Sequence, residues 1–141
     1  MIPNPHNPKY LLAGTENCIQ VWNIENAATA VRERRSPIEP RRLTHPNLPA
    51  DAAVDGLIQL DEDHIVSKVA GSGVLFVWKL ETALANPEPE AESKLIEPEK
   101  ILNWSDTDEM YLNLSANMKR NTILAGDANG RIWVYSVRTN I

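Results

Sequence analysis

The sequence has little cysteine, and this absence restricts where the protein can work. Cys18 is the only cysteine among 141 residues, so no disulfide can form within the chain. Residues 1–5 have neither the basic region nor the apolar stretch of a secretory signal. No run approaches the roughly 18 apolar residues that a membrane-spanning helix needs. We therefore expect a reduced, intracellular protein, with Cys18 as a buried and inert thiol.

Basic charge is also scarce. The chain carries 14 Lys and Arg residues against 19 Asp and Glu residues, a formal net charge of −5. Such a balance argues against a broad electrostatic grip on a phosphate backbone. Basic residues gather in one part of the chain, at Arg32, Arg34, Arg35, Arg41 and Arg42. Acidic residues and prolines interrupt this group, and we interpret it as a solvated loop. Nucleic acid is not an expected partner.

The residue patterns of enzymes and cofactor sites are missing as well. His6, His45 and His64 lie far apart and have no second ligand at metal spacing. The acidic clusters at residues 61–63 and 106–109 lack the calcium-loop pattern and predict solvated turns. Gly71-Ser72-Gly73 lacks the third glycine of a dinucleotide motif and predicts a hairpin turn. The sequence therefore predicts no enzyme, no metal and no cofactor.

What the sequence does contain is a repeated unit. Each of three segments has a short apolar strand, a turn rich in Gly, Asn and Asp, and a second apolar strand that ends in an aromatic residue. The closing aromatic residues are Trp22, Trp78 and Tyr135, spaced 56 residues (22 to 78) and 57 residues (78 to 135) apart. Asn129-Gly130 is the strongest hairpin signal among the turns. Because residues 75–78 are all apolar, both faces of that strand should be covered.

These repeats predict an all-β fold: one domain over residues 1–141, a partial WD40 β-propeller of about three blades of four-stranded antiparallel sheet. Further strands are expected at residues 56–60 and 110–114. The tryptophans inside strands should be packing residues. The alternative fold is a small β-sandwich. The extra length of each repeat is assigned to loops at residues 27–50 and 85–100, with a short helix at 27–35 capped by Asn26.

Three blades cannot close a ring. The sheet faces at both ends would be exposed, which invites association. We therefore expect either that the chain is part of a longer one, as a partial gene product would be, or that the isolated segment self-associates.

The order of the repeats resembles a particular group of WD proteins. Val54-Asp55 followed by Ser67-Lys68 is similar to a blade of the Polycomb EED/ESC-like family, and so is His45-Pro46-Asn47. Residues 124–135 resemble the family's corresponding repeat, with Tyr135 in place of the usual Trp. The likeness spans residues 10–137. The origin-recognition-complex-associated leucine-rich/WD-repeat protein family is similar in the same blades and is the close alternative.

The EED-like resemblance implies a nuclear, non-catalytic subunit of a histone H3 methyltransferase complex that binds trimethyl-lysine in an aromatic cage. Rings attract such a cation through their negative faces. Where the family has a Trp-Tyr pair, this sequence has Met110-Tyr111, so Tyr111 matches and Met110 departs. Trp104 is a further candidate for the cage.

Two functions are thus open. One is a chromatin adaptor that binds histone tails and methyltransferase or other partner subunits. The other is a general WD scaffold without a methyl-lysine pocket, such as an origin-complex-associated adaptor, an assembly factor or a ubiquitin-ligase substrate receptor.

Overall fold

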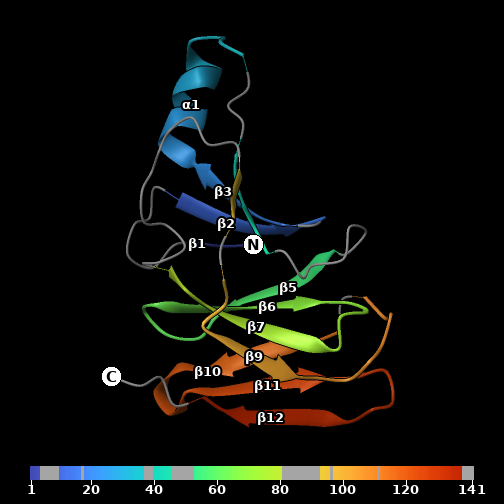
Figure 1. The fold of residues 1–141 in the computed structure, drawn as a ribbon. Coiled ribbons are helices and arrows are strands. Elements are labelled where there is room, and N and C mark those ends of the chain that lie inside the picture. Colours follow the sequence, from blue (N-terminus) through green and yellow to red (C-terminus); the bar gives the residue numbers. More distant parts are fainter. Residues whose placement is uncertain are drawn as a thin grey trace.

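The computed structural model describes residues 1–3, 10–16, 18–36, 40–45, 53–80, 93–95, 97–110 and 112–137. The described chain forms three β-sheets stacked one on the next, as a partial propeller requires (Figure 1). We call these sheets the first, second and third blades in chain order. The predicted all-β fold of about three propeller-type blades is therefore confirmed.

The first blade has the strand order β1-β2-β3-β4-β8. Its strands are β1 (Ile2–Pro3), β2 (Tyr10–Thr15), β3 (Cys18–Asn23), β4 (Arg41–Thr44) and β8 (Ser93–Leu95). The first four strands pair antiparallel, whereas β8 adds parallel to β4. The stretch 27–50, expected to be a loop, thus contains the strand β4.

The second blade is the predicted four-stranded antiparallel sheet, in the order β5-β6-β7-β9. Its strands are β5 (Val54–Gln59), β6 (His64–Val69), β7 (Val74–Lys79) and β9 (Lys100–Asn103). The third blade has three described strands, β10 (Leu114–Asn117), β11 (Thr122–Gly126) and β12 (Ile132–Ser136), with a 3-10 turn η1 (Met118–Arg120) after β10. In the second blade, residues 75–78 are all buried, so both faces of β7 are covered as predicted.

Two hydrophobic clusters fill the spaces between the blades. Between the first and second blades lie Leu12, Ile19, Val21, Leu43, Val54, Ile65, Val69, Phe76, Trp78 and Leu80. Between the second and third lie Leu60, Val66, Leu75, Val77, Trp104, Ile123, Ala125 and Val137. Alternate residues of one strand enter different clusters because side chains alternate across a pleated sheet. Trp78 and Trp133 are therefore packing residues as predicted, Trp133 half-buried against the second cluster, while Trp22 is half-buried.

The helix begins earlier than the sequence suggested. Helix α1 (Ile24–Arg32) follows β3 directly, and its N-cap is Asn23 rather than Asn26. The Asn23 side chain accepts a hydrogen bond of 3.0 Å from the backbone N–H of Asn26. The predicted position was wrong because two capping residues stand three apart, and the first one satisfies the N–H of the second.

The predicted strand at residues 110–114 also lies elsewhere. Strand β10 begins at Leu114, and Met110 precedes it in a connection without strand structure. Backbone hydrogen bonds tie the start of that connection to the β6–β7 turn: Trp104 N donates to Gly73 O at 2.8 Å, and Gly71 N donates to Thr107 O at 2.7 Å. The pairing of β10 with β11 continues only to the bond from Gly126 N to Asn113 O at 3.0 Å, because β11 ends at Gly126 and residues before Asn113 have no strand residue opposite them.

The remaining expectations concern turns and helices. Gly130 closes the hairpin between β11 and β12 with a φ of +76°, the left-handed conformation predicted for Asn129-Gly130. Residues 61–63 form a bend between β5 and β6, as expected. Within the described ranges, no helix has the length and apolarity to cross a membrane. Of the expected loop at 85–100, residues 93–95 and 97–100 are described, and this part is not loop throughout, because it contains β8 and the first residue of β9.

Candidate functional site

A buried ion pair joins the inner strands of the second blade. The Lys68 ammonium lies 2.6 Å from the Asp55 carboxylate, and neither side chain is exposed to solvent. Asp55 falls where the β5–β6 register shifts between Val54 and Gly56, and such a bulge re-aims the side chain at that point. Gly56 leaves room for the lysine, since a Cβ there would approach Lys68 Cε to 3.1 Å. Both residues were part of the family resemblance in the sequence, but their ion pair was not predicted.

Trp104 completes this buried group. The Lys68 Nζ lies 5.2 Å from the centre of the Trp104 ring, within the range of a cation–π contact. The tryptophan is buried, and its Nε1 finds no hydrogen-bond partner in the part of the chain that is described. The ring is therefore engaged by a lysine of its own chain.

The three residues predicted for a methyl-lysine cage are not assembled by the described structure. Trp104 is buried between the second and third blades, whereas Met110 is 42% exposed. Tyr111 lies outside the described residues. The cage therefore stays a prediction.

Each of the later blades has a tryptophan whose indole N–H is satisfied within the fold. Trp78 Nε1 donates to Ser67 Oγ at 2.8 Å, and the ring of buried His45 lies 5.3 Å from that of Phe76 and 5.9 Å from that of Trp78. The Trp78–Ser67 bond joins β6 to β7, and the His45 ring packs these strands against the first blade. His45 is a packing residue in this arrangement.

Asp127 organises the hairpin of the third blade in the same way. Its carboxylate accepts hydrogen bonds from Trp133 Nε1, Asn129 N and Arg131 N, all at 2.9 Å. The Trp133 bond, the two backbone bonds and the Arg131 charge lower the pKa of Asp127 below its usual value, although burial opposes them. The residue stabilises the turn as an ionised group.

His64 stands between two carboxylates at the end of the second blade. Its Nδ1 lies 2.8 Å from Asp61 Oδ1, and its Nε2 lies 2.7 Å from Glu99 Oε2 at ion-pair distance, outside hydrogen-bond geometry. Asp61 also accepts bonds from the backbone N–H groups of Asp63 and His64. His64 therefore ties the β5–β6 turn to the residue before β9. Within the described ranges, no three metal-ligating side chains gather in one place.

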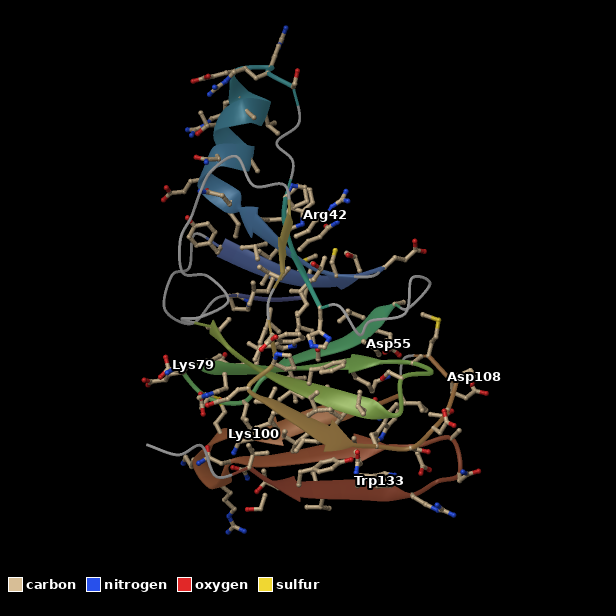
Figure 2. All side chains as sticks on the ribbon, viewed as in Figure 1. Arg42, Asp55, Lys79, Lys100, Asp108 and Trp133 are labelled. Atoms are coloured by element: carbon tan, nitrogen blue, oxygen red, sulfur yellow. The ribbon has the colours of Figure 1, made fainter. Side chains whose placement is uncertain are left out.

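Polar side chains that are free of such internal roles lie on the connection between β9 and β10. Asp106, Asp108, Glu109 and Met110 are exposed there, while Trp104 and Thr107 anchor the segment. Figure 2 shows Asp108 at the edge of the stack beside the second and third blades. This arrangement presents an acidic surface with one exposed apolar residue, Met110.

The stacked blades and their buried tryptophan contacts define a WD-repeat protein, a class that binds other proteins. A family model described as the WD domain of leucine-rich repeat and WD repeat-containing protein 1 matches residues 3–141, and the chain belongs to this family. The mouse protein of that name is 27% identical over 135 residues, which are 91% of this chain and 19% of the relative. The human protein is 31% identical over 84 residues, 60% of this chain and 13% of the relative.

A zebrafish relative of the same name is 34% identical over 86 residues and is covered to 11% of its length. The chain thus spans about a fifth or less of these relatives. Of the two families that the sequence resembled, the relatives support the leucine-rich/WD-repeat family and not the Polycomb EED-like family. In the structure the marker residues Asp55 and Lys68 form a buried ion pair.

Proposed function

We propose that the chain is a non-catalytic WD scaffold that holds other proteins together, and that it acts as a nuclear chromatin adaptor of the origin-complex-associated type. The membership in a WD-repeat family supports the scaffold role. The chromatin role rests on the sequence resemblance, and the net charge of −5 is compatible with a basic partner.

The proposal rests on the observation that the polar side chains of the blades pair with one another inside the fold. Those that an active site would need are engaged in holding the strands and turns within each blade together: His64 with Asp61, Lys68 with Asp55, and Asp127 with Trp133. Among the exposed parts of the described chain is the acidic connection of residues 105–110, in which Asp106, Asp108 and Glu109 are exposed. We propose this connection as the contact surface for a basic partner segment.

The methyl-lysine reader is the less favoured function. A cage needs an accessible ring face, and the face of Trp104 is already turned to Lys68. Calorimetric titration of trimethyl-lysine H3 peptides against the full chain tests it directly. Saturable binding that depends on the methyl groups and is lost in Tyr111→Ala would restore the reader.

The scaffold proposal is tested by affinity purification from nuclear extract with the full chain and two matched charge-reversal variants. Asp108→Lys alters the connection, and Glu62→Lys makes the same charge change at an exposed residue of another turn. We expect Asp108→Lys to lose partner proteins that the wild type and Glu62→Lys retain. If all three chains recover the same proteins, the contact surface is wrong; if none recovers a chromatin protein, the adaptor role is wrong.

A further inference from the structure

Strand β8 is an addition to the first blade. The second blade is complete with four antiparallel strands, and the first blade already has four of its own, β1 to β4. β8 then pairs with the outer edge of β4, with Lys94 opposite Leu43 at the centre of a ladder of three residue pairs. Among the described strands this pairing is the only parallel one. β8 is therefore held by a short ladder of the less stable kind.

The connection that carries β8 is much longer than the strands on either side of it require. Strands β7 and β9 pair antiparallel, with Val77 opposite Lys100, and such neighbours are usually joined by about two to five residues. Here residues 80–99 lie between them, because the chain leaves the second blade, adds β8 to the first and returns to form β9. The second blade does not need this detour, so it can keep its four strands when β8 leaves β4.

The outer edge of β4 is suited to strand addition. A strand edge offers a row of N–H and C=O groups, and proteins use such edges to bind extended peptides from other chains. The opposite edge of β4 pairs with β3, and Leu43 is buried in the cluster between the first and second blades, so β4 itself is firmly held. β8 shows that an extended segment fits this edge in parallel register.

The charges of the two segments indicate what kind of peptide fits. Residues 32–42, which lead into and include part of β4, contain five arginines and two glutamates, and Arg42 is exposed on β4 itself. The sequence before β8 has the opposite sign, since residues 86–92 contain three glutamates and no lysine or arginine. Opposite charges favour the pairing of two strands, and salt weakens that attraction. An acidic extended peptide is therefore the ligand that suits this edge.

We propose that the outer edge of β4 is a docking site for an extended, acidic segment of a partner protein, and that β8 occupies this site while no partner is bound. Because β8 is tethered to the site, it competes with a free peptide at an effective concentration of about the millimolar range. A partner segment must replace the short β8 ladder with a longer or better paired one. This site is on the first blade and does not depend on the function proposed for residues 105–110.

Fluorescence anisotropy with a labelled peptide tests the proposal on the full chain. The probe has the sequence of residues 86–97, and the variant that we call the opened chain carries Ser93→Pro with Lys94→Pro. Every second residue of a parallel strand donates to the same neighbour, so one of the two prolines must remove a ladder N–H. We expect saturable binding to the opened chain. Binding to the wild type, and to the control Glu97→Pro outside β8, should be at least roughly tenfold weaker because the tethered strand competes.

Further variants locate the bound peptide. Arg42→Glu in the opened chain should weaken binding several-fold, whereas Arg120→Glu, the same change at an exposed residue of the third blade, should leave it unchanged. Hydrogen exchange of the β4 amides should be faster in the opened chain than in the wild type, and the added peptide should restore their protection. Circular dichroism melting identifies an opened chain that has lost its fold, and Lys94→Gly with Leu95→Gly then replaces the two prolines.

Each other outcome overturns the proposal. If the folded opened chain does not bind the peptide, β8 only covers the edge of β4. Equal binding to the opened chain and the wild type shows that the peptide binds elsewhere, and so does binding that Arg42→Glu leaves unchanged. Protection that returns only outside β4 has the same meaning.

Discussion

The Lys68 ammonium contacts the Asp55 carboxylate at 2.6 Å in a site that water does not reach. Removing two charges from water is costly, so such a pair contributes little net stability, but loss of one partner leaves the other as a buried charge. The Trp104 ring beside Lys68 adds a cation–π contact at the boundary with the third blade. The pair therefore sets how the inner strands of the second blade meet.

We predict that Lys68→Met lowers the free energy of unfolding by about 3–5 kcal/mol, because Asp55 then remains buried without its ammonium partner. Methionine retains most of the apolar stem of the lysine. Urea unfolding followed by tryptophan fluorescence measures the change.

The matched control is the double variant Lys68→Met with Asp55→Leu, which removes both charges. We expect it to recover a large part of the stability lost in the single variant. Equal stabilities of the single and double variants would show that the charge of Asp55 is not what Lys68 neutralises.

Gly14 marks a close approach between the first two blades. A Cβ at this position would collide with the backbone oxygen of Val54, and backbone cannot move aside as a flexible side chain can. We predict that Gly14→Ala destabilises the chain by roughly 1–3 kcal/mol, the usual cost of overpacking. Ala13→Gly is a useful neighbour control because it removes a methyl group instead of adding one. Thermal melting of Gly14→Ala at the wild-type temperature would contradict the close contact.

The end of α1 holds a strained residue. Arg34 has a φ of +55°, in the left-handed region that follows many helices and that favours glycine. The bond from Arg35 N to Ala30 O at 2.9 Å closes this helix end. We predict that Arg34→Gly stabilises the chain by about 0.5–1 kcal/mol. Arg34→Ala removes the same charge without relieving the backbone, so a similar gain in both variants would assign the effect to charge.

The blades were predictable from the sequence because their signals are local. A strand, a turn and an aromatic-ended strand follow each other within about twenty residues, as the pairing of Leu124 with Val134 across the Asn129-Gly130 turn illustrates. The added strands were not predictable. Strand β4 pairs with β3 across α1, and β8 joins from roughly fifty residues further along the chain. Segments as short as these show no clear alternation of apolar and polar residues that would identify them as strands.

The candidate site was harder still. The pairing of Asp55 with Lys68 depends on a register shift in β5, which no residue pattern announces. Trp104 was predicted for ligand contact because an aromatic residue near Tyr111 suits a cage. Its burial against Lys68 depends on the packing between two blades. The residue type alone suggested a cage, but the sequence could not predict which way the Trp104 ring faces.

Tyr135 gives the fold a dependence on alkaline pH. Its hydroxyl donates to Asn103 O at 2.6 Å, which joins β12 to the outer strand of the second blade. Burial raises the pKa of Tyr135 from 10.0 to about 12. Between these two values the folded state holds a proton that the unfolded state has lost, so stability falls as the pH rises from 10 toward 12.

Tyr135→Phe removes both the hydrogen bond and this titration. We predict a loss of about 0.5–1.5 kcal/mol at neutral pH, the usual net value of one hydrogen bond, and a weaker decline of stability above pH 10 than in the wild type. Tyr10→Phe is the matched control, and phenolate absorbance identifies the hydroxyl that titrates last. If the wild type and Tyr135→Phe lose stability in parallel from pH 10 upward, the Tyr135 hydroxyl does not stay protonated in the folded state, and its bond to Asn103 is not what joins the two blades.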